Sequence, residues 1–320
     1  MPVKDSNPPA KRARISAPPQ PRARREPLPS NRPKPAEDDP DAPQRVAAIL
    51  ANPSYREADE DVDFLSGDQA RGPRLQLDYF KAESLLQQHG VLHTIVVFGS
   101  TRIVEPAAAR RNVERLQKAL APDPGNPDLL RRLAIATRIQ AKSIYYDMAR
   151  EFGRLVGKAG GGRVVVMTGG GPGMMEAANR GAYDVGAKSV GLNINLLHEQ
   201  YPNPYITPDL CFRFHYFAMR KLHFLLRAKA LVAFPGGYGT FDELFETLTL
   251  VQPRKIEPVP IVLVGERYWR QAFDVRFLVD EGVIDPEDRE LFWYAETAQE
   301  IWDGILEWHK INGEPLLAST

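Results

Sequence analysis

Short apolar runs alternate with amphipathic stretches along most of this chain. Apolar, β-branched runs that are typical of buried strands lie at 94–98 and near Val164, Val190, Leu231 and Ile261. Apolar positions at helical spacing predict helices over 75–88, 107–120, 127–158, 216–226, 269–280 and 298–310, with two more beginning near Met174 and Thr240. This alternation predicts an α/β fold, a Rossmann-like three-layer α/β/α sandwich with a mainly parallel sheet and right-handed crossovers.

A glycine-rich loop follows the run near Leu231 and precedes a helix. It contains Gly236, Gly237, Gly239 and Thr240. We expect the glycines to take positive φ and to let the backbone approach a ligand closely, while the start of the helix offers unpaired N–H groups and positive dipole to an anion. The loop therefore predicts a phosphate cradle, with a phosphorylated small molecule as its ligand.

Glu243 lies in the first turns of the helix after this loop, and two interpretations of it remain open. Thr240 and Glu243 have the spacing of a capping box, in which both side chains only satisfy backbone groups at the helix start. Alternatively, Glu243 is a functional carboxylate beside the bound phosphate.

A second glycine loop, with Gly170, Gly171 and Gly173, joins another strand run to another helix. Two such loops place two strand-to-helix turns at one sheet edge, in the crevice where ligands of open parallel sheets bind. The chain has no P-loop sequence, and Glu176 stands where a dinucleotide fingerprint needs its third glycine. A hydride-transfer enzyme is therefore disfavoured.

Two further strand ends carry polar residues. Ser100 follows the 94–98 run and can bring N–H and hydroxyl donors to an anion, although an ordinary turn explains it as well. A group of polar residues follows the run near Val190 and can meet the substrate, although a plain polar loop is an equal explanation. Its members are Asn193, Asn195, Glu199 and Gln200.

Taken together, the motifs resemble one known family. The GGGPGMME loop, the adjacent Arg220 and Lys221, and the PGGYGTFDE segment resemble the LOG family, long mislabelled as lysine decarboxylases, over about residues 75–308. The resemblance implies that Arg220 and Glu243 are the functional residues. It also implies hydrolysis of the N-glycosidic bond of a nucleoside 5′-monophosphate, to a free base and ribose 5-phosphate, by a homodimer or larger assembly. Pyridoxal chemistry is disfavoured, because it requires a Schiff-base lysine in an organised site.

This chain departs from the short, cytokinin-type members in two places. Those members tend to have glycine where this chain has Glu176, and they lack the stretch over 106–160, so the sequence looks more like the larger bacterial branch. These departures count against a cytokinin nucleotide, and we expect an AMP-like substrate, but no motif marks the groups that read the base, so the choice of base stays open. Glu176 is a further candidate for contact with base or ribose, although a helix ion pair with Arg180, four residues later, explains it as well.

Composition limits the remaining possibilities. The 320 residues carry no formal net charge, which calls for neither nucleic acid nor membrane as a partner. Cys211 is the single cysteine, so neither a disulfide framework nor a cysteine metal cluster is expected, and we expect no cofactor. No apolar stretch reaches the ~20 residues of a membrane helix. These features favour a soluble, cytoplasmic protein.

The N-terminal region differs in composition from the rest of the chain. Twelve of the 28 prolines lie in the first 43 residues, together with two basic clusters, which predicts a disordered tail over 1–45. Residues 46–74 are polar and mixed and predict a lead-in with little regular structure. A single LOG-like domain is expected over 75–320.

Two other classes of function keep the same glycine loops. One is a non-catalytic carrier of a phosphate-bearing cofactor, such as a molybdenum-cofactor carrier, which needs no catalytic glutamate. The other is a protein that only senses a nucleotide such as AMP or an alarmone. The presence of both Arg220 and Glu243 favours the hydrolase.

Overall fold

The computed structural model describes residues 27–195 and 201–317, and the chain divides into two units, 1–70 and 71–320. The first unit contains α1 (Ala42–Leu50) and α2 (Val62–Ser66). The expectation of little regular structure in this lead-in is therefore wrong. The Asp61 side chain caps α2 by accepting from the amide of Phe64, at 3.1 Å. Most of the predicted tail, residues 1–26, lies outside the described residues.

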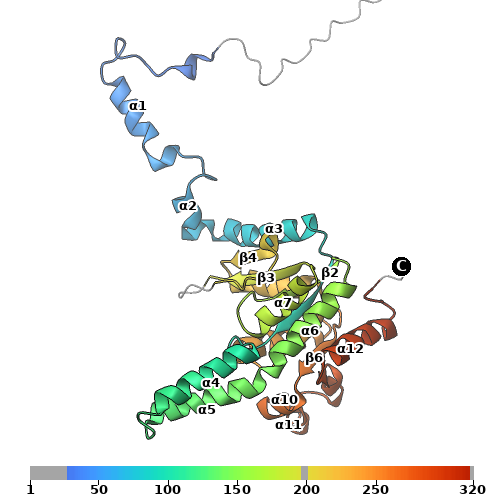
Figure 1. Ribbon diagram of the computed structural model, residues 1–320. Coiled ribbons are helices and arrows are strands. Elements are labelled where there is room, and N and C mark those ends of the chain that lie inside the picture. The colour runs from blue at the N-terminus through green and yellow to red at the C-terminus, as the bar shows by residue number, and fades with distance from the viewer. Residues whose placement is uncertain (1–26, 196–200, 318–320) are drawn as a thin grey trace, which may run out of the picture. The chain divides into compact units, whose positions relative to one another are not determined.

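The second unit is built on a seven-stranded sheet in the order β4-β3-β2-β1-β5-β6-β7, and every pairing is parallel (Figure 1). The strands are β1 (His93–Phe98), β2 (Val164–Thr168), β3 (Ser189–Ile194), β4 (Cys211–Phe214), β5 (Ala228–Ala233), β6 (Ile261–Val264) and β7 (Trp293–Ala295). The predicted α/β fold with a parallel sheet is confirmed. The edge strands β4 and β7 were not predicted, because runs of four and three residues are too short to show a strand pattern.

The helices of this unit are α3 (Arg71–Gln88), α4 (Pro106–Leu120), α5 (Pro127–Lys142), α6 (Ile144–Ala159), α7 (Met174–Asp184), α8 (Phe217–Leu226), α9 (Tyr238–Val251), α10 (Glu266–Ala272), α11 (Val275–Asp280) and α12 (Ala298–Ile311). Two predicted helices are each split in two. Ser143 separates α5 from α6, and both its amide and its hydroxyl donate to the carbonyl of Gln140. Asp274 separates α10 from α11 by accepting from the amides of Arg276 and Phe277.

Alternate residues of each central strand face opposite layers of helices. Ile95 and Val97 of β1 pack with α6, α7 and α12 in one hydrophobic core. Val96 and Phe98 pack with α3, α8, α9 and α10 in the other. This period-two separation, with both faces of the sheet covered, makes the three-layer sandwich.

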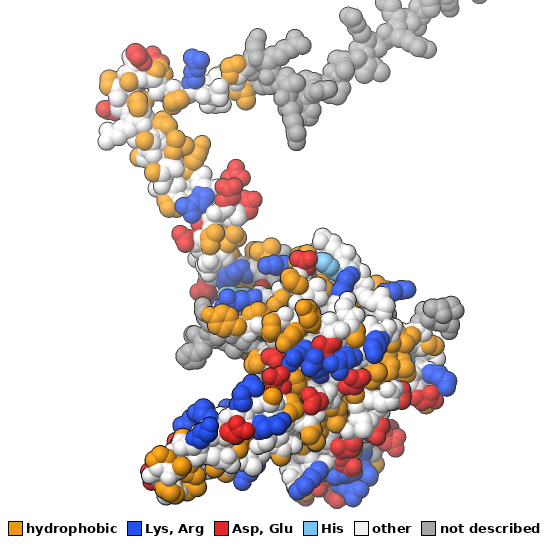
Figure 2. Space-filling model, viewed as in Figure 1, with side chains coloured by type: hydrophobic (Ala, Val, Ile, Leu, Met, Phe, Trp, Pro, Cys, Tyr) orange, Lys and Arg blue, Asp and Glu red, His pale blue; other side chains and the backbone are white. Residues whose placement is uncertain are grey.

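Helices α4 and α5 form an antiparallel pair that projects from the sheet (Figure 1). Their contact is a small apolar cluster containing Val113, Leu116 and Ala136. Basic side chains lie along this pair in Figure 2, where α4 and α5 extend to the lower left. We refer to residues 106–142 as the α4–α5 arm.

Candidate functional site

The order of the strands creates a crevice at one place on the sheet edge. The chain runs from β1 through β2, β3 and β4 on one side, and then returns to place β5 on the other side of β1. The loops after β1 and β5 leave the sheet at this switch point, where open parallel sheets bind their ligands. The amide of Ser100 donates to the carbonyl of Pro235 at 3.0 Å, and the amide of Met174 donates to the carbonyl of Ser100 at 3.1 Å. All three predicted strand-end loops are therefore joined.

A cavity of about 580 Å³ opens where the loops meet, which is a volume typical of small-molecule sites. Its lining comes from the β1 loop (Phe98, Gly99, Ser100, Thr101, Arg102, Ile103), the arm (Ile139, Lys142), the second glycine loop and α7 (Gly169, Met175), α8 (Arg220, Phe224), the 235–240 loop with Glu243, and Tyr268. The cavity thus combines the predicted pair Arg220 and Glu243 with the predicted phosphate cradle.

Arg220 and Glu243 form a buried ion pair at this cavity. Their side chains are 15% and 7% exposed, and Arg220 Nη2 lies 3.4 Å from Glu243 Oε1, at the outer limit of a hydrogen bond. The guanidinium carbon lies 4.8 Å from the ring centroid of Phe217 and 5.6 Å from that of Phe224. Arg220 is therefore not a solvent-exposed surface charge of α8.

The hydrogen-bonding capacity of the Arg220–Glu243 pair is only partly used. Arg220 Nε is buried and has no hydrogen-bond partner among the described residues. Buried charges are normally paired and hydrogen-bonded, since desolvation is costly. A buried arginine with a free N–H donor and one long contact, beside a cavity, can donate to the oxygen atoms of a ligand.

Burial also changes the acidity of Glu243. Loss of solvent raises the pKa of Glu243 to about 7, against the opposing effect of the nearby Lys221 and Arg220 cations. Burial lowers the pKa of Arg220, and Glu243 acts in the opposite direction. Because the ordinary pKa of an arginine lies far above neutral pH, Arg220 stays charged at neutral pH. The site therefore has a fixed cation beside a carboxyl group that titrates in the physiological range.

The 235–240 loop differs from its prediction in two respects. None of Gly236, Gly237 and Gly239 has positive φ. A Cβ on Gly236 would lie 2.1 Å from Thr240 Oγ1, whereas Gly237 and Gly239 have open space beside them. Glycine is needed here for close packing and for access to the backbone.

The second difference concerns the helix start. Helix α9 begins at Tyr238, and its N-cap residue is Gly237. Thr240 is therefore not the N-cap, and the predicted capping box of Thr240 and Glu243 is wrong. Thr240 already lies in the first turn, and its amide donates to the carbonyl of Gly237 at 2.9 Å. The amides of Tyr238 and Gly239 precede the first helical hydrogen bonds, and both residues line the cavity. The start of α9 therefore offers backbone donors to an anion.

Gly170 and Gly173 of the second loop pack against neighbouring segments and do not themselves line the cavity. Gly170 and Gly173 have φ of 71° and 73°. Added Cβ atoms would lie 2.0 Å from Asn193 Oδ1 and 2.4 Å from the carbonyl oxygen of Ser100, respectively. The carbonyl of Gly171 accepts from Asn203 Nδ2 at 3.1 Å. These three predicted residues do not line the cavity, whereas their neighbour Gly169 does.

Ser100, Lys221 and Glu176 lie in different surroundings. Ser100 lines the cavity, and its side-chain oxygen accepts from the amide of Arg102 at 3.1 Å. Lys221 points away and joins α8 to α9 through ion pairs of 2.8 Å to Asp242 and 2.9 Å to Glu246. Glu176 does not line the cavity either.

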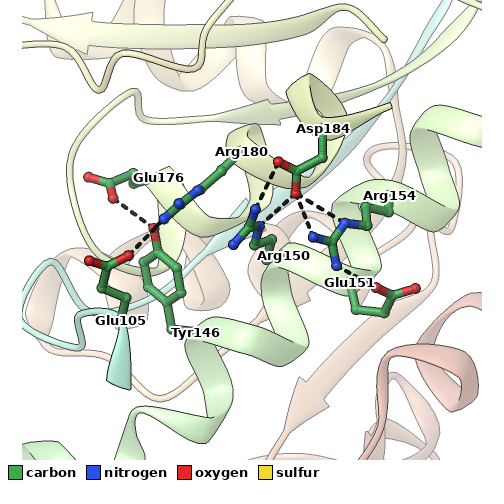
Figure 3. Close-up of polar contacts among 8 residues, drawn as sticks. All are labelled: Glu105, Tyr146, Arg150, Glu151, Arg154, Glu176, Arg180 and Asp184. Atoms are coloured by element: carbon green, nitrogen blue, oxygen red, sulfur yellow. Dashed lines mark hydrogen bonds and ion pairs between the residues drawn. The ribbon is translucent and has the colours of Figure 1, made fainter. Parts of the chain in front are cut away.

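The predicted ion pair of Glu176 with Arg180 is wrong. Glu176 Oε1 accepts from the hydroxyl of Tyr146 at 2.7 Å, while Arg180 Nη1 donates to Glu105 at 2.8 Å (Figure 3). Both side chains contact the Tyr146 hydroxyl of α6, and the carboxylate that pairs with Arg180 is that of Glu105, directly before α4. A spacing of four residues on one helix was therefore insufficient to predict the contact.

The polar residues after the run near Val190 are only partly described. Asn193 is buried, and its Nδ2 has no hydrogen-bond partner among the described residues. Asn195 Oδ1 accepts from Arg213 at 2.6 Å. Glu199 and Gln200 lie outside the described residues.

Several cavity residues were not found from the sequence, among them the following four. Arg102 and Tyr268 come from loop and helix positions without a motif, and Ile139 and Lys142 come from the arm. The hydroxyl of Tyr268 donates to the carbonyl of Gly236, which ties α10 to the glycine loop. Only the helical spacing of Ile139 and Lys142 put them on one side of α5, and that spacing does not indicate what they face.

Residues 27–195 and 201–317 contain neither a membrane-spanning helix nor a cluster of metal-binding side chains. No helix there has the length and apolar character to span a membrane. No group of three or more His, Cys, Asp or Glu side chains there is arranged to hold a metal ion.

Two solved structures that are similar to this chain have low sequence identity and low TM-scores. A molybdenum cofactor binding protein from Rippkaea orientalis is 19% identical, with a TM-score of 0.37 over 51% of this chain and 87% of that one. A molybdenum cofactor carrier protein from Chlamydomonas reinhardtii is 16% identical, with a TM-score of 0.39 over 69% of this chain and 99% of that one. Likeness at this level says nothing about ligand or activity.

Sequence comparison is more specific. A family model described as "possible lysine decarboxylase" matches residues 175–305. LOGL3 of Oryza sativa subsp. japonica, a probable cytokinin riboside 5′-monophosphate phosphoribohydrolase, is 29% identical over 52% of this chain and 78% of its own length. LOG3 and LOG7 of Arabidopsis thaliana, both cytokinin riboside 5′-monophosphate phosphoribohydrolases, are 36% and 38% identical, each over 26% of this chain and over 39% and 38% of their own lengths. The chain thus spans less than half of these two relatives. The family model and these relatives show that this part of the chain is similar to proteins of the LOG family.

Proposed function

We propose that the protein hydrolyses the N-glycosidic bond of a nucleoside 5′-monophosphate, with AMP or a similar nucleotide as substrate. The products are the free base and ribose 5-phosphate. The observation that carries this proposal is the buried Arg220–Glu243 pair. The pair lines a cavity that is also lined by the first residues of α9. Similarity to relatives that are named phosphoribohydrolases supports the same reaction class.

Each part of the cavity has a role in this reaction. The C1′–N bond breaks with a build-up of positive charge on the ribose, and water then adds its oxygen to C1′ while the base takes up a proton. A Glu243 carboxylate stabilises that charge and holds the ribose hydroxyls. Arg220 keeps the carboxylate in place and offers its free donor to the ligand. The amides at the start of α9 bind the 5′-phosphate.

The test of the proposal is a panel of purine and pyrimidine nucleoside 5′-monophosphates, including a cytokinin nucleotide, assayed for release of ribose 5-phosphate. We expect release from at least one nucleotide of the panel, with AMP cleaved faster than the cytokinin nucleotide. Tight binding of nucleotides without any release would contradict the proposal and favour the carrier or sensor. The homodimer that the family resemblance implies also stays a prediction.

The raised pKa of Glu243 predicts the pH dependence of this activity. If the carboxylate is the active form, kcat/KM should fall about tenfold per pH unit below pH 7 and level off above it. Measurement of kcat/KM from pH 5 to 9 checks this predicted fall below pH 7. A flat profile between pH 6 and 8 would contradict an essential Glu243 with this pKa.

Stability should depend on pH in the opposite sense. A carboxyl group whose pKa is higher in the folded than in the unfolded protein contributes stability below its unfolded pKa, and this contribution is lost as pH rises through about 7. Thermal melting of Glu243→Gln should lack this part of the pH dependence, which links the two measurements to one residue.

A further inference from the structure

The α4–α5 arm reaches the cavity with its last turn. Lys142 is the final residue of α5, and Ile139 lies one turn earlier on the same side of the helix; both line the cavity. Ser143 ends α5 directly after Lys142. The arm therefore forms part of the cavity wall, together with the strand-end loops.

The charges at this cavity do not balance. The charged residues of its lining are Arg102, Lys142, Arg220 and Glu243, three cations to one carboxylate. Glu243 is already paired with Arg220, and within the described part of the chain neither Lys142 nor the Arg102 side chain has an ion-pair partner. Because the whole chain carries no formal net charge, this excess is a local property of the cavity. Uncompensated cations in a concave site attract an anionic ligand.

The base of the arm is held in place, so the position of Lys142 is defined. Figure 3 shows Glu105, which precedes α4, pairing with Arg180 of α7, while Tyr146 of α6 donates to Glu176. Arg180 Nη1 also lies 3.3 Å from the Tyr146 hydroxyl. Burial raises the pKa of Tyr146, so its hydroxyl keeps the proton that it donates. These contacts join both ends of the arm to the helix that follows the second glycine loop.

One turn further along α6, a second set of ion pairs strengthens this attachment. Arg150 donates to both carboxylate oxygens of Asp184, at 2.6 and 2.9 Å, and Arg154 reaches the same carboxylate at 2.8 Å (Figure 3). Bidentate pairs of this kind fix orientation as well as distance. Helix α6 is thus held along α7, and Lys142 lies two residues before its first turn.

We propose that Lys142, together with Arg102, is an anion-binding subsite that contacts the phosphate of the ligand, so that the arm is part of the binding site. The identity of the ligand as a nucleotide rests on the proposed function. The ammonium group adds a mobile point charge to the fixed amide donors of α9. The alternative is that Lys142 only complements the dipole at the end of α5. Lys118 occupies the equivalent place in the last turn of α4, outside the cavity lining, and is a matched control.

The experiment is calorimetric titration of the full chain with AMP, ribose 5-phosphate, inorganic phosphate and adenosine. We compare wild type, Lys142→Ala and Lys118→Ala. Lys142→Ala should weaken binding of the three phosphate-bearing ligands at least about tenfold, as the loss of a charged hydrogen bond predicts, and leave adenosine unchanged. Lys118→Ala should bind all four ligands like wild type. Lys142→Met, which keeps the apolar stem, should repeat the Lys142→Ala result and excludes lost packing as its cause.

Two results would overturn the subsite. One is Lys142→Ala binding AMP within twofold of wild type, and the other is an equal loss of affinity for AMP and adenosine. Thermal melting of each variant identifies a folding defect. If Lys142→Ala has such a defect, the binding measured with Lys142→Met decides whether the charge of Lys142 contributes to ligand affinity. Because binding is measured without turnover, Lys142-dependent binding in a protein that cleaves no nucleotide would leave the subsite intact and reject only the hydrolase proposal.

Discussion

Replacing Glu243 with glutamine should lower the turnover of AMP at least ~100-fold, about 2.7 kcal/mol in the barrier, while the fold and nucleotide binding persist. An uncharged amide has nearly the shape of the carboxylate but cannot stabilise a cationic ribosyl centre. Its oxygen can still accept from Arg220, whose contact with Glu243 is already long at 3.4 Å. The charge is therefore the main property that the substitution removes.

The measurement is steady-state release of ribose 5-phosphate, with calorimetric binding of AMP and thermal melting for each variant. Glu246→Gln is the matched control. Glu246 lies three residues further along α9 and pairs with Lys221, but it does not line the cavity. We expect Glu246→Gln to keep near-normal turnover.

A Glu243→Gln protein with near-normal turnover would assign this residue a structural role and favour the carrier. Arg220→Ala extends the test to the other half of the pair. We expect it to lose activity and also to bind AMP more weakly, because it removes the buried donor that faces the ligand. It also leaves Glu243 buried without its partner, so we expect it to melt at a lower temperature than Glu243→Gln.

The second large effect concerns the substrate. AMP should be cleaved with at least about 100-fold higher kcat/KM than adenosine, because binding energy from a remote phosphate orients the reacting bond. The start of α9 and the cations Arg102 and Lys142 supply the donors for that phosphate. Inorganic phosphate and ribose 5-phosphate should compete with AMP.

Rates on AMP, adenosine and 5′-deoxyadenosine separate the phosphate from the 5′-hydroxyl. The two nucleosides should be similarly poor substrates, since both lack the phosphate. Comparable efficiency on AMP and adenosine would reject the phosphate cradle and, with it, the assignment of the glycine loop to that role.

The sequence by itself determined the layers of the fold and the sheet edge at which the glycine loops lie. Strand runs and helical spacing are local patterns, and they predicted the parallel sheet and its three layers correctly. Glycine loops that follow strands must lie together at one edge, because every strand of a parallel sheet ends there. The candidates Arg220 and Glu243 came from a family resemblance, and their catalytic roles stay predictions.

Only the tertiary structure decided how these parts combine. The order of the strands brings the loops after β1 and β5 side by side, and packing buries Arg220 of α8 against Glu243 of α9. Local patterns failed where a distant neighbour had the larger effect. Helix α9 begins before Thr240, and Glu176 bonds to Tyr146 instead of Arg180. Burial, which raises the pKa of Glu243, depends on every segment that surrounds it, so no local pattern could reveal it.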